Sequence, residues 1–234
     1  MSDPLLATHG LDAFYGDFQA LFGISIRVEP GEVVAIIGAN GAGKTTLMRS
    51  VSGLITNAPE MVRLKGQPIG RLRADEVARR GVAMVPEGRQ LFPSLSVEEN
   101  LLIGGQIGRP GPWSLDAFLA LFPVLAERRH MPSTALSGGQ QQMVAIGRAL
   151  MANPELILFD EMSLGLAPIV IKSIYDTLPK IIGEGMSAII VEQDIVKAMT
   201  VSNRIYCLQE GRVSLEGRSG DVSREQIAEA YFGM

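Results

Sequence analysis

The chain has 234 residues, which is enough for one large domain with a full hydrophobic core. Charged residues make up 20%, hydrophobic residues make up 47%, and the formal net charge is −4. This composition excludes a disordered chain and argues against a general nucleic-acid-binding protein. The longest unbroken apolar run is six residues, Ala117 to Phe122. Because a membrane span needs about 20, we do not expect the chain to cross a bilayer by itself.

The sequence also bears on the cellular compartment. The N-terminal residues have neither a basic start nor a long apolar stretch, so we expect no signal peptide. Cys207 is the single cysteine, which excludes an internal disulfide. Both features favour a reducing cytoplasm.

The first strongly predicted element is a strand over residues 32–37, with β-branched and apolar side chains on both faces. It leads directly into Gly38. From Lys44 the sequence predicts a helix that ends at residues 52–53, followed by a strand and a turn at 61–68. A strand, a glycine-rich loop and a helix in this order indicate a phosphate-binding domain.

Further buried strands are predicted at residues 82–85, 156–159 and 188–191. Each is followed by polar residues, and in an open α/β sheet the carboxyl ends of the strands border the ligand site. We therefore expect these polar residues to converge on one site. Short strands at residues 203–208 and 212–215 complete the predicted strands, and the last predicted element is a helix over residues 224–232.

Between two of these strands the pattern becomes helical. The helical segments are separated by glycine and proline, notably at residues 107–112. We interpret residues 87–154 as a helical lobe inserted into an α/β core of residues 1–86 and 155–234. The prediction is therefore a single domain, 1–234, with a helical subdomain.

Residues 38–45 fit the pattern G-x-x-x-x-G-K-[ST], in which Gly43, Lys44 and Thr45 form the end. The glycines let backbone N–H groups turn towards phosphate oxygens, and the helix N-terminus adds the positive end of its dipole. Lys44 would contact the β- and γ-phosphates, and Thr45 would bind Mg²⁺. A glycine-rich turn without a ligand is the alternative, which the flanking strand and helix argue against.

Two adjacent carboxylates, Asp160 and Glu161, follow the strand 156–159. Asp160 suits the coordination shell of Mg²⁺, and Glu161 suits a base for the attacking water. An ordinary solvated turn is the alternative. Residues 136–142, Leu-Ser-Gly-Gly-Gln-Gln-Gln, predict a second helix start that could bind an anion, with a simple Ser-capped helix as the alternative.

Together these motifs resemble the ATP-binding subunits of ABC transporters, with Walker A at 38–45, the signature at 136–140 and Walker B at 156–161. The resemblance covers essentially the whole chain. It implies a P-loop NTPase α/β core, N-terminal antiparallel strands and the inserted helical lobe. It also implies ATP and Mg²⁺ as cofactors, and a signature that closes over the nucleotide held by another subunit.

The residues that the resemblance assigns to nucleotide binding come from three segments. An upstream aromatic residue stacks on adenine in the family, the Walker A loop holds the phosphates, and the signature completes the site. These residues are Tyr15, Gly38, Ala39, Asn40, Gly41, Ala42, Gly43, Lys44, Thr45, Thr46, Ser137, Gly138, Gly139 and Gln140.

Several positions depart from the general family pattern. Glu87 stands where Gln is usual, Gln193 where the switch His is usual, and Ala167 where Asp is common. These departures resemble one of the two ATPase subunits of branched-chain amino acid importers. Met162 replaces a proline usual in both groups. The implied catalytic residues are Glu161, Lys44, Gln193 and Glu87, and the implied metal ligands are Thr45, Asp160 and Glu87.

The resemblance implies a Mg²⁺-dependent ATPase that powers uptake of branched-chain or hydrophobic amino acids. Its partners would be a second cassette, identical or different, two permease chains in the membrane and, indirectly, an extracytoplasmic solute-binding protein, with no nucleic acid. It would lie on the cytoplasmic face of the membrane. The alternatives are a urea or amide transporter, a soluble ABC ATPase, and a degenerate ATP-binding scaffold, which Glu161 argues against.

Overall fold

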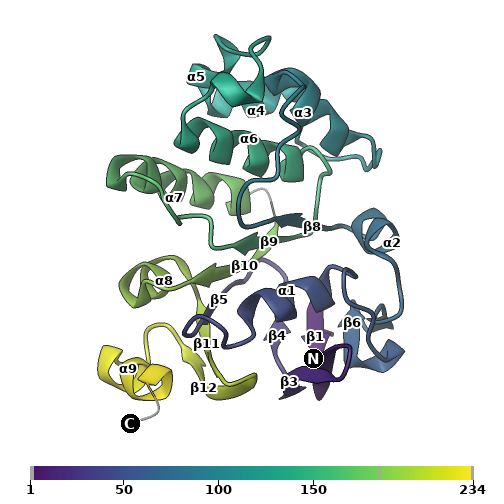
Figure 1. Ribbon diagram of the computed structural model, residues 1–234, viewed down its shortest axis with the longest axis vertical. Coiled ribbons are helices and arrows are strands. Elements are labelled where there is room, and N and C mark those ends of the chain that lie inside the picture. Colours follow the sequence, from purple (N-terminus) through teal and green to yellow (C-terminus); the bar gives the residue numbers. More distant parts are fainter. Residues whose placement is uncertain (1–2, 184, 233–234) are drawn as a thin grey trace. The chain divides into compact units, whose positions relative to one another are not determined.

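The computed structural model describes residues 3–183 and 185–232 (Figure 1). These residues form two compact units. The first unit combines the chain up to Val77 with the chain from Ser187 onwards, and the second runs from Ala78 to Met186. Each unit is described by itself. Among the described residues, none of the helices has the length and apolar character that crossing a membrane requires.

The first unit contains a sheet and two helices that pack on it. The strands are β5 (Val33–Ile37), β10 (Ser187–Glu192), β11 (Arg204–Gln209) and β12 (Arg212–Arg218). The helices are α8 (Ile195–Val201) and α9 (Arg224–Phe232). β5 pairs in parallel with both β10 and β11, whereas β12 is antiparallel to β11. All of β5 is buried, as its apolar sequence predicts. Ala198 of α8 and Ile227 of α9 pack with Ile205 on one face of this sheet.

The N-terminal part of the first unit is antiparallel, as expected. Its elements are β1 (Leu6–Thr8), β2 (Leu11–Tyr15), β3 (Phe18–Ile24), β4 (Arg27–Val28), α1 (Lys44–Val51), η1 (Pro59–Met61), β6 (Val62–Leu64), β7 (Gln67–Pro68) and the part of α2 (Ala74–Arg79) up to Val77. β2 and β3 form a hairpin, and the other strands form a sheet in the order β4-β1-β6-β7. The hairpin lies beside α1.

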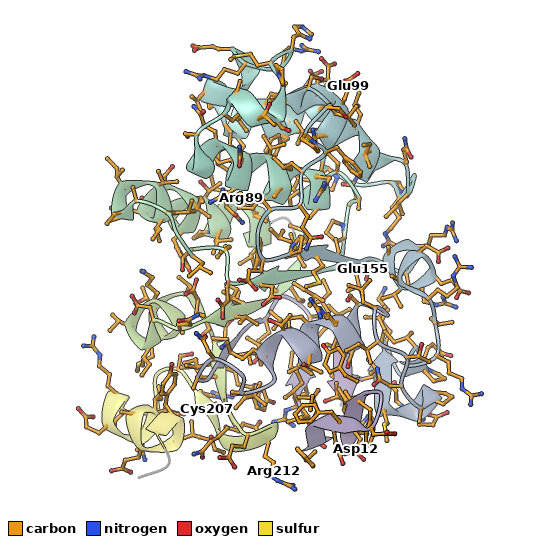
Figure 2. The ribbon with its side chains drawn as sticks, in the orientation of Figure 1. Asp12, Arg89, Glu99, Glu155, Cys207 and Arg212 are labelled. Atoms are coloured by element: carbon orange, nitrogen blue, oxygen red, sulfur yellow. The ribbon has the colours of Figure 1, made fainter. Side chains whose placement is uncertain are left out.

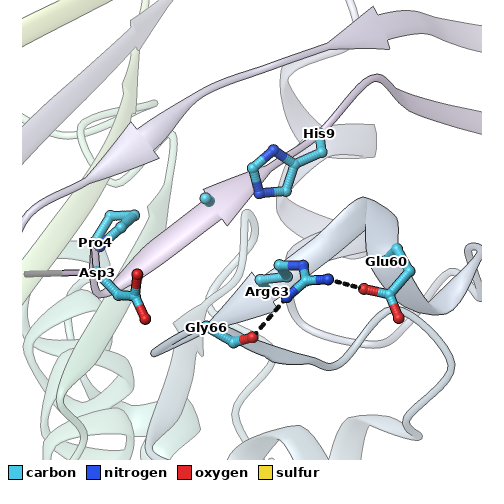
Figure 3. A pocket seen from close by; sticks show the side chains of 7 residues that line it. Asp3, Pro4, His9, Glu60, Arg63 and Gly66 are labelled. Carbon is cyan, nitrogen blue, oxygen red and sulfur yellow. Dashed lines mark hydrogen bonds and ion pairs between the residues drawn. The ribbon is translucent and has the colours of Figure 1, made fainter.

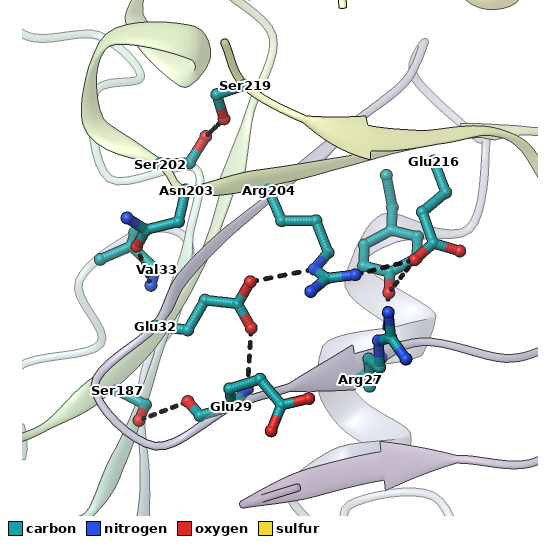
Figure 4. Close-up of polar contacts among 11 residues, drawn as sticks. Arg27, Glu29, Glu32, Val33, Ser187, Ser202, Asn203, Arg204, Glu216 and Ser219 are labelled. Atoms are coloured by element: carbon teal, nitrogen blue, oxygen red, sulfur yellow. Dashed lines mark hydrogen bonds and ion pairs between the residues drawn. The ribbon is translucent and has the colours of Figure 1, made fainter. Parts of the chain in front are cut away.

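A polar network joins β11 and β12 to the residue that precedes β5 (Figure 4). Arg204 donates to Glu32 at 2.9 Å and to Glu216 at 3.0 Å. The Tyr206 hydroxyl donates to Glu216 at 3.0 Å and accepts from the Arg27 N–H at 3.2 Å. Burial of the phenol raises the pKa of Tyr206 to about 12. This network lies at the start of β5, whereas the phosphate loop follows its end.

The second unit pairs β8 (Val82–Val85) in parallel with β9 (Leu156–Asp160). Its helices are α3 (Val97–Gly105), α4 (Leu115–Leu121), α5 (Pro123–Ala126), η2 (Ser133–Ala135), α6 (Gly138–Leu150) and α7 (Pro168–Gly183). α3 and α4 pack closely on α6, because a Cβ on Gly147 would lie 2.3 Å from Phe118 and 2.5 Å from Leu101. This close approach requires glycine at position 147.

The fold class predicted from the sequence is confirmed. The strand 82–85 and the helix 224–232 have the predicted bounds, and the helix from Lys44 ends at Val51 with Ser52 as its cap. Buried Cys207 lies in β11 (Figure 2). The boundaries between the two compact units fall at 77/78 and 186/187. The second unit therefore contains β8, β9 and α7 as well as the helices α3 to α6. The helical subdomain 87–154 stays a prediction.

Candidate functional site

The loop between β5 and α1 is built on glycines. Gly41 has φ +83° and Gly43 has φ +100°, a left-handed conformation that favours glycine. A Cβ on Gly38 would lie 2.4 Å from the carbonyl oxygen of Leu208, and one on Gly43 would lie 2.6 Å from Cδ2 of Leu21. The loop therefore fits closely between β11 and β3.

Lys44 is the first residue of α1, and only 5% of its surface is exposed. Its ammonium group donates to the carbonyl oxygens of Gly38 at 2.8 Å and Ala39 at 3.0 Å. The lysine side chain thus folds back over its own loop. A positive charge held by carbonyl dipoles beside a helix N-terminus is an arrangement that can receive an anionic phosphate.

Tyr15, at the end of β2, reaches α1. Its hydroxyl lies 3.4 Å from Oγ1 of Thr46 and 3.4 Å from Nη1 of Arg49, which donates to it. The tyrosine is 44% exposed. The structure thereby brings the predicted adenine-stacking residue next to Thr46, two residues after Lys44. Arg49 was not singled out by sequence reasoning, because nothing in the sequence shows its proximity to Tyr15.

Gln193 directly follows β10, and it is exposed. Glu192 of β10 pairs with Ile37 of β5, the residue before Gly38. The next residue, Asp194, caps α8 by accepting from the Lys197 N–H at 3.1 Å. Partial burial disfavours its charged form, but the hydrogen bonds from Lys197 outweigh this effect and lower the pKa of Asp194.

The second unit holds the carboxylates. Val85 pairs with Phe159, and Glu87 and Glu161 each lie two residues beyond that pair. Asp160 is buried, with 1% of its surface exposed. Glu161 has φ +48°, which is strained for a residue with a side chain. The structure therefore places Glu87, Asp160 and Glu161 at the carboxyl ends of neighbouring strands, as the sequence predicts.

The predicted anion-binding helix start is a capping box. The Ser137 hydroxyl accepts from the N–H of Gln140, and the Gln140 side chain accepts from the N–H of Ser137. Gly139 faces Val170, because a Cβ there would lie 2.4 Å from that side chain. This packing explains why a glycine is required in the first turn of α6.

Two arginines that sequence reasoning missed connect the segment after Glu87 to α6. Arg89 (Figure 2) donates to the side chain of Gln141 at 3.3 Å. Arg148 donates to the carbonyl oxygens of Gln90 at 2.7 Å and Arg89 at 3.1 Å, and burial lowers the pKa of Arg148. The left-handed backbone at Arg89 and Gln90 is thus held by hydrogen bonds.

The predicted metal ligands Thr45 and Asp160 carry oxygen donors. Within residues 3–183 and 185–232, no three His, Cys, Asp or Glu side chains gather into a metal site. Mg²⁺ is usually held by one or two carboxylates together with phosphate oxygens and water. The Thr45 hydroxyl in the first unit and the Asp160 carboxylate in the second unit are each a hard oxygen donor of the kind that Mg²⁺ accepts.

An open pocket of about 530 Å³ lies elsewhere in the first unit (Figure 3). Arg63 in this pocket donates to the Gly66 carbonyl at 2.8 Å and forms an ion pair with Glu60. His9 also lines it, but none of the predicted site residues does. The pocket is therefore separate from the candidate site.

Comparison with known proteins identifies the family. The model of the family described as "ABC transporter" matches residues 21–163. The chain therefore belongs to the ABC transporter family, and its fold is that of an ATP-binding cassette.

Individual relatives cover almost the whole chain. The high-affinity branched-chain amino acid transport ATP-binding protein BraG of Pseudomonas aeruginosa is 39% identical over 98% of this chain and 100% of its own length. The ADP conformation of the cassette MJ1267 has a TM-score of 0.84 at 29% identity and full coverage of both chains. A dimeric post-hydrolysis state of the cassette MJ0796 with ADP and Pi has a TM-score of 0.81 at 27% identity, covering 92% of this chain and 98% of that one.

Proposed function

We propose that this chain is the ATP-binding and ATP-hydrolysing subunit of an importer for branched-chain amino acids. The observation that carries the proposal is the loop 38–45, in which Gly38 and Gly43 leave no room for a Cβ and the Lys44 ammonium is buried against the loop carbonyls. Such a loop at a helix N-terminus is suited to bind a polyphosphate. Tyr15 would stack on the adenine.

The hydrolytic step is assigned to residues that follow strand ends. Glu161 accepts a proton from water as the water oxygen attacks the γ-phosphorus and ADP leaves. The amide of Gln193 donates a hydrogen bond to the γ-phosphate. Thr45 and Asp160 would hold Mg²⁺, which supplies neutralisation of phosphate charge. The carboxylate of Glu87 would approach this site through Mg²⁺ or its bound water, because phosphate repels it.

The working ATPase is proposed to be a dimer of cassettes with shared sites. The signature residues Ser137 to Gln140 open a helix whose first N–H groups point out of its N-terminus. In the shared site this helix start would bind the nucleotide held by the Walker A loop of the partner. The dimeric form of the MJ0796 cassette supports this arrangement. Light scattering of the Glu161→Gln variant with ATP distinguishes an identical partner from a different cassette.

The transported solute is inferred from similarity. BraG, at 39% identity over its full length, is named for branched-chain amino acid transport. The departures Glu87, Gln193 and Ala167 resemble the same subgroup. The chain would work at the cytoplasmic face of the membrane with two permease chains, which receive the solute from an extracytoplasmic binding protein.

One experiment tests this function. The tagged chain is purified from detergent-solubilised membranes, its partners are identified by mass, and the complex is reconstituted in vesicles. We expect membrane chains to co-purify and ATP hydrolysis to rise when leucine and the solute-binding protein are supplied. Lys44→Ala is the control that keeps the partners and loses the hydrolysis. Stimulation by urea or short amides instead of leucine, co-purification with ribosomes or DNA, or an assembled complex without turnover would contradict the proposal.

A further inference from the structure

The tip of the β2–β3 hairpin carries exposed aromatic side chains. Phe14 is 50% exposed, Tyr15 is 44% exposed and Phe18 is 69% exposed. Gly16 and Asp17 form the two-residue turn between the strands, with Gly16 at φ +58°. At the hairpin tip these rings are accessible to a ligand or a partner.

The strand register assigns these rings to opposite faces of the hairpin. Tyr15 is the direct cross-strand partner of Phe18, so their side chains share one face with Cβ atoms about 5 Å apart. Phe14 is the partner of Gln19 on the other face. The Gln19 side chain donates to Asp12 at 3.0 Å, and Asp12 lies two residues before Phe14 on β2, which is consistent with this second face.

The face with Tyr15 and Phe18 is turned towards the phosphate loop. The Tyr15 hydroxyl lies 3.4 Å from Thr46 of α1. On β3, the side chain of Leu21 lies against Gly43, where an added Cβ would approach it to 2.6 Å. The hairpin is thus packed on the loop through Leu21 of β3, and the hydroxyl of Tyr15, the cross-strand partner of Phe18, lies beside the first turn of α1.

We propose that Phe18 forms, together with Tyr15, a two-ring surface for the purine base of the bound nucleotide, and that Phe18 is a specificity-determining residue. This inference rests on the proposed function, because the nucleotide phosphates must lie in the loop 38–45. The base would then lie against Tyr15, the proposed adenine-stacking residue, and so at the tip of the hairpin. Aromatic rings stack on any base, and the larger purine covers more of two rings than a pyrimidine does.

The test measures equilibrium affinities of the full chain for MgATP, MgCTP and inorganic tripolyphosphate, which has no base. Phe18→Ala is expected to weaken ATP binding about tenfold, the size of one lost base-stacking contact. Binding of CTP should weaken less, and binding of tripolyphosphate should stay within about twofold of wild type. Phe18→Trp should restore the ATP affinity, because it restores an aromatic face.

Phe14→Ala is the matched control, since it removes a ring of similar exposure from the opposite face of the same hairpin. It should leave all three affinities unchanged. Thermal melting of each variant verifies folding. Equal weakening of ATP and tripolyphosphate by Phe18→Ala would show a structural effect and overturn the inference.

Three other results would also overturn it. If Phe18→Ala binds ATP like wild type but loses its membrane partners on purification, the ring contacts protein and not the base. If wild type binds neither ATP nor tripolyphosphate, the proposed function itself fails together with the inference. Normal ATP binding by both wild type and Phe18→Ala would overturn the inference about Phe18 and leave the proposed function standing.

Discussion

Glu192 and Ile37 are direct partners in the parallel pairing of β10 with β5. The residues that follow them, Gln193 and Gly38, therefore leave the sheet at the same edge, although they are distant in sequence. This register places residue 193 at the strand end beside the start of the phosphate loop. Gln193 stands where the family usually has a histidine, and in the proposed function its amide acts on the γ-phosphate from this position.

Glutamine has no ionisation near neutral pH, whereas histidine has a pKa of about 6.5. We expect the wild-type complex to hydrolyse ATP without a pH dependence that originates at position 193. Gln193→His should introduce one between about pH 6 and pH 7, measured from kcat/KM profiles. Gln193→Ala should lower turnover. Identical hydrolysis and phosphate affinity in Gln193→Ala and wild type would exclude Gln193 from the site.

Glu161→Gln should keep nucleotide binding and lower turnover by about 100-fold or more, because an amide has the same shape but cannot accept a proton from water. The measurement is phosphate release by the assembled complex, with ATP affinity measured in parallel. Asp176→Asn on α7 is a suitable control, as this exposed carboxylate pairs with Lys172. A Glu161→Gln complex within about threefold of wild type would exclude the base role.

Ser137→Arg tests whether the signature acts on the partner's nucleotide. The bulky side chain should block closure of the dimer while ATP binding by the isolated chain stays intact. Light scattering of Glu161→Gln with ATP should give a doubled mass if the chain pairs with itself, and a monomer if it requires a different cassette. If a folded Ser137→Arg monomer loses its own ATP binding, the shared-site arrangement is wrong.

Gly38→Ala should destabilise the first unit, because its Cβ would lie 2.4 Å from the backbone oxygen of Leu208. Backbone atoms cannot move aside as a flexible side chain can, and overpacking of this kind costs about 1–3 kcal/mol. Urea unfolding would measure the loss. Gly220→Ala is the control, since nothing lies within 4 Å of its added Cβ. Equal stability of the two variants would contradict the close approach at Gly38.

The raised pKa of Tyr206 predicts that the protein loses stability at alkaline pH. Its pKa is about 12 in the folded chain, against 10.0 for an unperturbed tyrosine. The phenol therefore contributes fully below about pH 10, and its contribution is lost as pH rises through about 12. The raised pKa of Tyr206 corresponds to a contribution on the order of 2 kcal/mol to the free energy of unfolding.

The measurement is urea unfolding of wild type and Tyr206→Phe at about pH 8 and pH 11. The variant should be less stable than wild type at the lower pH, because Glu216 and the Arg27 N–H lose a hydrogen-bond partner. Wild type should lose more stability than the variant on going to the higher pH. A constant difference between the two proteins would show that Tyr206 is not the group responsible.

The local elements of both units were predictable from the sequence. The strand before Gly38, the helix from Lys44 and the capping box at Ser137 depend on neighbouring residues, through apolar periodicity and short-range hydrogen bonds. Helices α2, α7 and α8 were not predicted, and α2 has a single fully buried side chain, Val77, and therefore no apolar period. The motif spacing was sufficient to indicate the family.

What only the tertiary structure decided are the contacts between segments that are distant in sequence. The side chain of Arg148 reaches the carbonyl of Gln90, and the carbonyl of Leu208 closes on Gly38. The register that puts Phe18 beside Tyr15 and Phe14 on the other face depends on the turn at Gly16. A local pattern shows which side chains are apolar or charged, but strand register and packing decide which of them meet. The sequence by itself determined the chemistry available at each strand end, and the fold determined the neighbours with which that chemistry acts.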